Sequence, residues 1–181
     1  MKTYLSQTWT DPRIEFRTSR ISGYGMFARE PFKEGEVVCI VGGNAMTDSE
    51  FADFQAIHRN YNSIQIDENL HLVEDPEVTR DLEGSMNHSC DSNAWMGDEA
   101  TLVARQDIQA GEEVTIDYAL FTTQSNWMLD TRCRCGSPYC RRIITGDDWM
   151  REDVQERYRD HFSPFINRRI ARLMKGSADG S

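Results

Sequence analysis

The sequence predicts a mainly β (α+β) fold built around one core. Short apolar stretches separated by Gly and Pro fill residues 13–41, as strands joined by turns do. Strand-like runs return between residues 62 and 117. Apolar residues spaced three or four apart, which is typical of helices, occur in residues 47–58 and after residue 147. We therefore expect β structure to dominate, with one internal helix and a helical C-terminal region.

The chain has 181 residues, of which 39% are apolar, and its 8 Phe, 6 Tyr and 4 Trp can fill an interior. This composition excludes a disordered or low-complexity chain, and the length suits one domain. No run approaches the roughly 20 apolar residues that span a bilayer, and residues 1–10 lack the apolar segment of a secretory signal. We expect a soluble protein without membrane contact, in the cytoplasm or the nucleus.

Acidic residues outnumber basic ones by 30 to 20, which gives a formal charge of -10. This charge repels phosphate backbones, so we expect no direct nucleic-acid binding and favour a cationic partner. An acidic stretch, residues 67–83, contains seven acids and one base, Arg80. The seven acids are Asp67, Glu68, Glu74, Asp75, Glu77, Asp81 and Glu83. The stretch either holds a Lys-rich peptide near the protein or is a solvated face.

The internal helix is expected at residues 47–58. Thr47 and Glu50 stand at the spacing of a capping box, and apolar residues from Phe51 onward repeat every three residues. We expect this helix to lie across the sheet. The strands expected after it are residues 62–67, 70–73, 101–105 and 113–117.

Residues 32–38 and 108–114 echo each other, because each segment places Gly-Glu just before a β-branched run. The shared chemistry of a turn that enters a strand explains this echo without a duplication. We expect similar turns in the two places.

The region after residue 147 is expected to be a helical extension. Asp147 and Asp148 can cap a helix, and apolar residues follow at four-residue spacing until Pro164 interrupts the pattern. These apolar residues are Met150, Val154, Tyr158 and Phe162. A second short helix is expected from about residue 165 to residue 174, with residues 176–181 frayed.

Three of the five cysteines are clustered as Cys133-x-Cys135-x4-Cys140. An odd count with such crowding does not suit disulfides and favours zinc over inert thiols. Structural zinc takes four Cys or His ligands, so a fourth ligand must come from elsewhere. The candidates are Cys39, Cys90, His88 and His161. Cys90 lies in a polar loop and is the better candidate, whereas Cys39 stands in an apolar run and is most simply a buried residue.

Three other features either carry chemistry or serve structure alone. The glycines of Ser22-Gly23-Tyr24-Gly25 let the backbone bend around a ligand, or they make a plain turn. Residues 87–93, Asn-His-Ser-Cys-Asp-Ser-Asn, either bind the polar groups of a ligand or form a turn whose polar groups hydrogen-bond to one another. Tyr118 ends a strand, where a tyrosine is usually an amphipathic packing residue. No Ser-His-Asp or Cys-His pattern supports acyl transfer.

Taken together and in order, these features resemble the SET-domain family of protein lysine methyltransferases. The match runs through residues 21–28, 87–94 and 111–118 and ends in a post-SET-like cysteine motif at residues 133–141. It covers about residues 13–142. The resemblance implies small curved β-sheets, in which the Asn-His-Ser-Cys segment and the Asp-Tyr strand end form a pseudoknot.

The resemblance also implies a division of the chain into three parts. They are a SET domain at residues 13–121, a post-SET-like zinc-binding segment at residues 122–146 and a C-terminal helical extension at residues 147–175. The extension lies outside the resemblance, so its role is open between closing a substrate channel and making a dimer.

The activity implied by the resemblance is methyl transfer from S-adenosylmethionine to a lysine of a protein or peptide, with histones as the family's familiar substrate. Tyr118 would be the catalytic residue, because a neutral phenol can orient the amine or the methyl group. The residues implied to bind S-adenosylmethionine are Ser22, Gly23, Tyr24, Gly25, Asn87, His88 and Tyr118. One structural Zn²⁺ would be held by Cys90, Cys133, Cys135 and Cys140.

The chain departs from the family pattern at three places. It has Cys39-Ile40 where Glu-Tyr is common, Gly84-Ser85 where Arg-Phe is common, and Ile116 where Phe or Tyr influences the number of methyl groups added. These departures favour an alternative, a catalytically inactive zinc-stapled SET scaffold that binds a basic protein partner. A methyltransferase for a small amine is a third hypothesis. The aromatic residues considered as channel or adenine contacts are Tyr61, Trp95, Trp127 and Tyr139.

Overall fold

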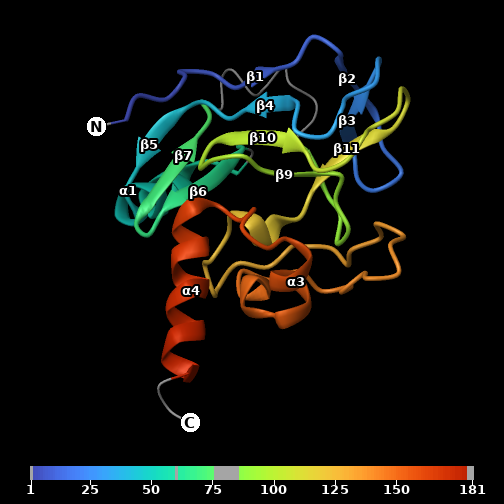
Figure 1. Cartoon of the computed structure of the whole chain (residues 1–181). Coiled ribbons are helices and arrows are strands. Elements are labelled where there is room, and N and C mark those ends of the chain that lie inside the picture. Colours follow the sequence, from blue (N-terminus) through green and yellow to red (C-terminus); the bar gives the residue numbers. More distant parts are fainter. Residues whose placement is uncertain (1, 60, 76–85, 179–181) are drawn as a thin grey trace.

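The computed structural model describes residues 2–59, 61–75 and 86–178 (Figure 1). Its strands are β1 (Trp9–Thr10), β2 (Ile14–Thr18), β3 (Tyr24–Ala28), β4 (Val37–Ile40), β5 (Asn44–Met46), β6 (Ser63–Asp67), β7 (Leu70–Val73), β8 (Asn87–His88), β9 (Ala94–Met96), β10 (Thr101–Ala104) and β11 (Glu113–Ile116). Its helices are α1 (Asp48–Ile57), α3 (Glu152–Arg157) and α4 (Pro164–Ala178), with short 3-10 helices η1 (Tyr118–Leu120) and η2 (Asp148–Met150). The predicted mainly β (α+β) class is confirmed.

The described strands form two sheets. The larger sheet has the strand order β1-β4-β10-β9-β11-β3-β2, and β8 pairs with β11 beside this path. The smaller sheet, β5-β7-β6, lies with α1 on one side of the larger sheet, opposite the β2–β3 hairpin (Figure 1). One buried cluster joins both sheets to the C-terminal helices, with Ile14, Leu72, Val114 and Phe165 among its members.

Helix α1 begins with the predicted capping box. The Thr47 hydroxyl accepts a hydrogen bond from the Glu50 N–H, and the Glu50 carboxylate accepts one from the Thr47 N–H at 2.8 Å. Phe51 is buried and stacks on His71 of β7, with ring centroids 4.3 Å apart. α1 therefore packs on the smaller sheet, whereas Ile57 at its end is 77% exposed.

The two echoing segments form the same turn and lie side by side. Gly35 and Gly111 have φ angles of 84° and 87°, in the left-handed region that glycine adopts without strain. In each turn the next residue, Glu36 or Glu112, accepts a hydrogen bond from the N–H three positions earlier. An antiparallel bridge joins the starts of the two segments. The expectation of similar turns is confirmed.

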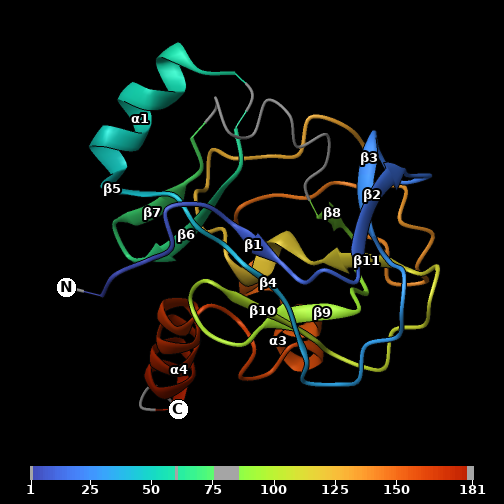
Figure 2. The same ribbon diagram turned by 90° about the horizontal axis from the view of Figure 1, so that it is seen from above.

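Residues 87–94 and 113–118 lie against each other, as the predicted pseudoknot requires. β11 pairs in parallel with both β8 and β9, and Figure 2 shows β8 beside β11 from above. The Asn93 side chain joins the two segments, because its Nδ2 donates to the Glu113 carbonyl at 2.9 Å and its Oδ1 accepts from the Thr115 N–H at 2.8 Å. The end of β11 is thereby held against the Asn-His-Ser-Cys loop.

The prediction of one helix from residue 147 to residue 162 is wrong. η2 and α3 are separate, α3 ends at Arg157, and Asp160 in the following turn has a φ angle of 66°. Asp148 does not cap a helix with its side chain but pairs with Arg141 at 2.7 Å. Pro164 begins α4, since a proline suits the first turn of a helix. The four-residue spacing did identify three core residues, Val154, Tyr158 and Phe162.

Helix α4 is longer than expected and projects away from the sheets at its C-terminal end (Figure 1). Its first half is covered by the body of the protein, with Phe165 and Ile166 fully buried. None of the helices in the described residues has both the length and the apolar character needed to cross a bilayer.

The first half of the acidic stretch is engaged within the chain. Asp67 pairs with Arg168 of α4 at 2.7 Å, and Glu68 pairs with Arg169 of the same helix. Glu74 is 6% exposed and accepts a hydrogen bond from an asparagine side chain. These carboxylates do not form a free docking surface for a basic peptide. The rest of the stretch (Glu77, Arg80, Asp81 and Glu83) and Gly84-Ser85 lie outside the described residues.

Candidate active site

Tyr118 stands at the junction of β11 and η1, and other aromatic rings surround it. Its ring is half-buried and contacts His88 edge-on at 5.1 Å between centroids, with Phe121 at 5.6 Å and Trp127 at 5.9 Å. The hydroxyl donates to the Met86 carbonyl at 3.1 Å. Burial raises the pKa of Tyr118 to about 12, so the side chain is a neutral phenol at physiological pH.

The glycine turn, residues 22–25, is fastened to β8 and β11 by side chains. Asn87 Nδ2 lies 3.0 Å from the Ser22 carbonyl, 3.1 Å from the Tyr24 carbonyl and 2.8 Å from a carboxylate oxygen of Glu113. The other carboxylate oxygen of Glu113 accepts from the Ser19 hydroxyl at 2.8 Å. The turn, β8 and β11 are thus brought together as predicted, and Asn87 acts here by holding the turn.

His88 joins the Tyr118 backbone to the cysteine cluster. Its Nδ1 accepts a hydrogen bond from the Tyr118 N–H at 3.2 Å, and its Nε2 lies 3.2 Å from Cys90 Sγ. Burial lowers the pKa of His88 to about 4, outweighing the nearby Asp117 carboxylate, so the ring is neutral at physiological pH. Because Nδ1 accepts, the proton of the neutral ring resides on Nε2 and is donated to Cys90.

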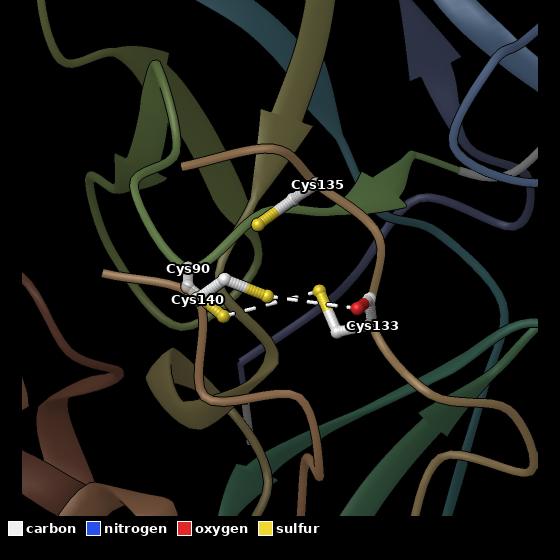
Figure 3. Close-up of side chains that lie close together, drawn as sticks. All are labelled: Cys90, Cys133, Cys135 and Cys140. Carbon is white, nitrogen blue, oxygen red and sulfur yellow. Dashed lines mark hydrogen bonds between the residues drawn. The ribbon is translucent and has the colours of Figure 1, made fainter. Parts of the chain in front are cut away.

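The four cysteines expected to bind zinc converge (Figure 3). The Sγ atoms of Cys90, Cys133, Cys135 and Cys140 all lie within 4.8 Å of one another, and those of Cys90 and Cys133 are 3.9 Å apart. Sulfur ligands about 2.3 Å from a tetrahedral zinc are about 3.8 Å apart, so the donor set and its spacing fit one Zn²⁺. The fifth cysteine, Cys39, is buried outside this cluster, as expected.

The thiols differ in how easily they ionise. Burial raises the pKa of Cys90 and raises that of Cys133 to about 12. Burial also acts to raise the pKa of Cys135, but backbone hydrogen bonds at Cys90 and Ser137 and the neighbouring thiols outweigh it and lower this pKa to about 7. Zinc binds thiolates, so a bound cation is the charge that would stabilise the ionised cluster.

A cavity of about 430 Å³ opens beside Tyr118 and extends towards the smaller sheet. Near Tyr118 its wall consists of Ile116, Phe121, Trp127 and Met86. Farther along, its wall includes Phe51, Tyr61, His71 and the buried Glu74. The volume is that of a small-molecule or side-chain site. Residues 22–25, 87 and 88 do not line this cavity, whereas Tyr118 lines it and its hydroxyl reaches the carbonyl of Met86, the residue before Asn87.

Of the four aromatic residues considered as contacts, Tyr61 and Trp127 line the cavity. Trp95 instead stacks on His161, with the ring centroids 3.3 Å apart, and Tyr139 is exposed beneath the Arg157 guanidinium. Sequence reasoning did not assign roles to Glu113, Met86 and Arg141, which contact Asn87, the Tyr118 hydroxyl and Asp117 respectively. Glu113 and Arg141 had a signal in the sequence, since they lie in the strand pattern and the cysteine motif of the resemblance, whereas Met86 had none.

The close packing around Gly25 predicts that a larger residue there disturbs the glycine turn. In Gly25→Ala the new Cβ would lie 2.2 Å from a Glu113 carboxylate oxygen and 3.0 Å from Asn87 Nδ2, so the Asn87–Glu113 hydrogen bond would be lost. If the turn holds S-adenosylmethionine, as the resemblance implies, we expect about tenfold weaker binding of that cofactor by calorimetry, the effect of about one hydrogen bond. The control is Gly176→Ala, where no atom lies within 4 Å of the added Cβ. Equal cofactor affinity in Gly25→Ala and the control would contradict the role given to the turn.

Three features point to the class of protein. They are two crossing segments, a tyrosine at the end of one of them, and four converging thiols. The family model described as SET domain matches residues 23–119, which is more than half of the chain. The chain therefore belongs to the SET-domain family, as the motifs indicated. The cysteine cluster is compatible with a post-SET zinc motif.

Curated relatives agree with this family. Histone-lysine N-methyltransferase ATX2 of Arabidopsis thaliana is 31% identical over 78% of this chain, and Histone H3-lysine(4) N-trimethyltransferase ATX1 of the same plant is 30% identical over 78%. Histone-lysine N-methyltransferase Su(var)3-9 of Drosophila melanogaster is 26% identical over 74%. The matched region spans only 14%, 14% and 25% of these three relatives. At the level of the family, these similarities support lysine methyltransferase activity with S-adenosylmethionine.

Proposed function

We propose that this protein transfers methyl groups from S-adenosylmethionine to the side-chain amine of lysine in a protein substrate. The observation that carries the proposal is the position of Tyr118, whose backbone contacts His88 and whose ring lines the cavity. Its hydroxyl donates to the carbonyl of Met86, the residue before Asn87, and Phe121 and Trp127 line the cavity beside its ring. Because the relatives are named for histone-lysine methylation, a histone is the first substrate to test.

The glycine turn fits a ligand that lies against backbone atoms. Tyr24 is 43% exposed, and no atom lies within 4 Å of the Cβ that Gly23 lacks. Asn87 keeps the two flanking carbonyls of the turn in place. S-adenosylmethionine, when bound there, supplies a methyl group already activated by a positively charged sulfur. The protein then needs to position the reactants and exclude water more than to act as an acid or base.

The residues around the cavity favour a neutral lysine amine and orient it for methyl transfer. Ile116, Phe121 and Trp127 give its inner end an apolar wall, which disfavours a charged ammonium and so favours the neutral, nucleophilic amine of lysine. The Tyr118 phenol stays neutral and offers an oxygen that orients the amine without competing as a nucleophile. The net negative charge of the protein attracts the lysine before the apolar wall favours loss of its proton.

The test is incubation with methyl-labelled S-adenosylmethionine and either core histones or fractionated cell proteins, followed by mass-spectrometric assignment of the methylated residue. Calorimetry with S-adenosylmethionine separates an enzyme from a zinc-stapled binding scaffold, which has no need of the cofactor. Cofactor binding with label on a lysine supports the proposal. Absence of cofactor binding by the zinc-loaded protein would overturn it.

Ile116 is expected to set how many methyl groups are added, because it lines the cavity next to Tyr118. Ile116→Phe fills space that a methylated amine needs in order to rotate for a second transfer. We expect the ratio of higher methylated products to monomethyl-lysine to fall about tenfold, within the range of about 1–3 kcal/mol for a packing difference in an apolar pocket. Ile116→Leu, of similar volume, is the control. A product distribution in Ile116→Phe that equals that of Ile116→Leu would exclude this role.

A further inference from the structure

The C-terminal extension contacts both segments of the crossing that carries Tyr118. Besides the exposed ion pairs of α4 with Asp67 and Glu68, the extension makes buried or part-buried polar contacts with residues next to the candidate catalytic and metal-binding groups. The family model does not cover this part of the chain, since it ends at residue 119.

The first contact is a buried ion-pair network. The Arg141 guanidinium donates two hydrogen bonds of 2.7 Å to the Asp117 carboxylate and a third, from Nε, to Asp148 at 2.7 Å. The side chains of Arg141, Asp117 and Asp148 are 3%, 0% and 9% exposed. Burial works against the charge of Arg141, but the hydrogen bonds and charge of Asp117 outweigh it and raise the Arg141 pKa. The three side chains therefore form a nearly dry network of short hydrogen bonds between oppositely charged groups.

Asp117 connects this network to Tyr118. It directly precedes Tyr118, and its carboxylate also accepts a hydrogen bond from the Ala119 N–H at 3.1 Å, which caps η1. Asp148 is in turn held by the Thr145 hydroxyl at 3.1 Å. A shift of Asp148 therefore moves the guanidinium of Arg141. Because this guanidinium is bonded to Asp117, the backbone that carries the Tyr118 ring moves with it.

Three more contacts tie the extension to the crossing independently of Arg141. The Ser163 N–H donates to the Leu120 carbonyl of η1 at 2.7 Å. The fully buried hydroxyl of Tyr158 accepts from the Ser92 N–H at 3.1 Å, and Arg157 donates to the Cys90 carbonyl at 3.1 Å. The first of these contacts reaches the segment after Tyr118, and the other two reach the loop after His88.

We propose that the extension positions the catalytic site: Asp148, through Arg141 and Asp117, fixes the Tyr118 backbone, while Tyr158 and Ser163 hold the two crossing segments together. Asp148 is then a positioning residue and touches no substrate. The catalytic consequence rests on the proposed methyl transfer, whereas the positioning itself does not.

The test compares Asp148→Ala with Asp148→Asn, because asparagine keeps an oxygen that accepts the hydrogen bond from Arg141 Nε. In Asp148→Ala we expect kcat to fall about tenfold, while the KM for peptide and the affinity for S-adenosylmethionine stay within about threefold, since small misplacements of a reacting group mainly slow turnover. Asp148→Asn is expected to recover kcat to within about threefold of the original protein. The matched control is Asp153→Ala, which removes an exposed ion pair with Arg151.

Hydrogen exchange supplies a measurement that needs no methyl transfer. We expect the amides of residues 117–120 to exchange about tenfold faster in Asp148→Ala but not in Asp153→Ala. If Asp148→Ala does not fold, Tyr158→Phe replaces it, with faster exchange expected at residues 88–92. The proposal would be overturned if the measured variant kept both the amide exchange rates and the kcat of the original protein. Faster exchange throughout the chain with an equal loss of cofactor affinity would also overturn it, because that pattern reports general destabilisation.

Discussion

Tyr118→Phe is expected to lose methyl transfer by a factor of about 10² or more, the typical loss for a positioned catalytic group. The substitution removes one oxygen from the end of the cavity and leaves the ring contacts with His88, Phe121 and Trp127 in place. It also leaves the Met86 carbonyl without its hydroxyl partner, which costs about 1 kcal/mol of folding stability. Cofactor affinity should change little, because the glycine turn, Asn87 and His88 are not altered and the backbone and ring of residue 118 are kept.

The measurement is single-turnover methyl transfer with labelled S-adenosylmethionine, together with calorimetry and thermal unfolding of the same samples. Tyr139→Phe is the control, since Tyr139 is an exposed tyrosine that does not line the cavity. Turnover in Tyr118→Phe that matches Tyr139→Phe would remove the phenol from the mechanism.

Loss of the metal is expected to have the largest effect on the fold. Replacing Cys133 by serine leaves three thiols. The zinc content should therefore fall from the expected one ion per chain to none, or to an ion that is weakly held. Structural zinc contributes folding free energy directly, so we expect the melting temperature to fall by about 10 °C or more. Because Cys90 belongs to the same loop as His88, cofactor binding should weaken with metal loss.

Metal content by mass spectrometry and the melting temperature with and without a chelator check this expectation. Cys39→Ala is the matched control, because Cys39 is equally buried but lies outside the cluster. It should keep one zinc and lose only about 1–2 kcal/mol for the missing sulfur. A stoichiometry of one zinc in Cys133→Ser, with unchanged resistance to chelator, would argue against a site made by these four thiols.

The features of this protein that could be predicted from sequence are those formed by residues close together along the chain. The Thr47–Glu50 capping box, the paired Gly-Glu turns and the crowded thiols each specify their structure within about ten residues. The fourth thiol, Cys90, was preferred to the other candidates because it lies in a polar loop, and the family resemblance then singled it out. Its position is explained by the parallel pairing of β8 with β11, which no local pattern reveals.

The C-terminal region shows where local reasoning fails. Tyr158 and Phe162 follow Val154 at helical spacing, yet only Val154 lies in α3. Tertiary contacts override the pattern, because the Tyr158 hydroxyl bonds to Ser92 while its ring stays fully buried. Likewise, Asp148 has the residue type of a helix cap, but the buried guanidinium of Arg141, next to the cysteine cluster, engages its carboxylate. Neither partner could be identified from spacing alone.

The pairing of β8 with β11 has a consequence for how a ribosome makes this protein. When residues 87–90 leave the exit tunnel, the strand that will pair with them and the three thiols that will join Cys90 have not yet emerged from it. Nascent chains fold from the N-terminal side, so this loop must wait without its partners until residues 133–140 emerge. During that interval the β3 and β8 edges are unpaired and Cys90 is a free thiol, so aggregation and oxidation compete with native folding.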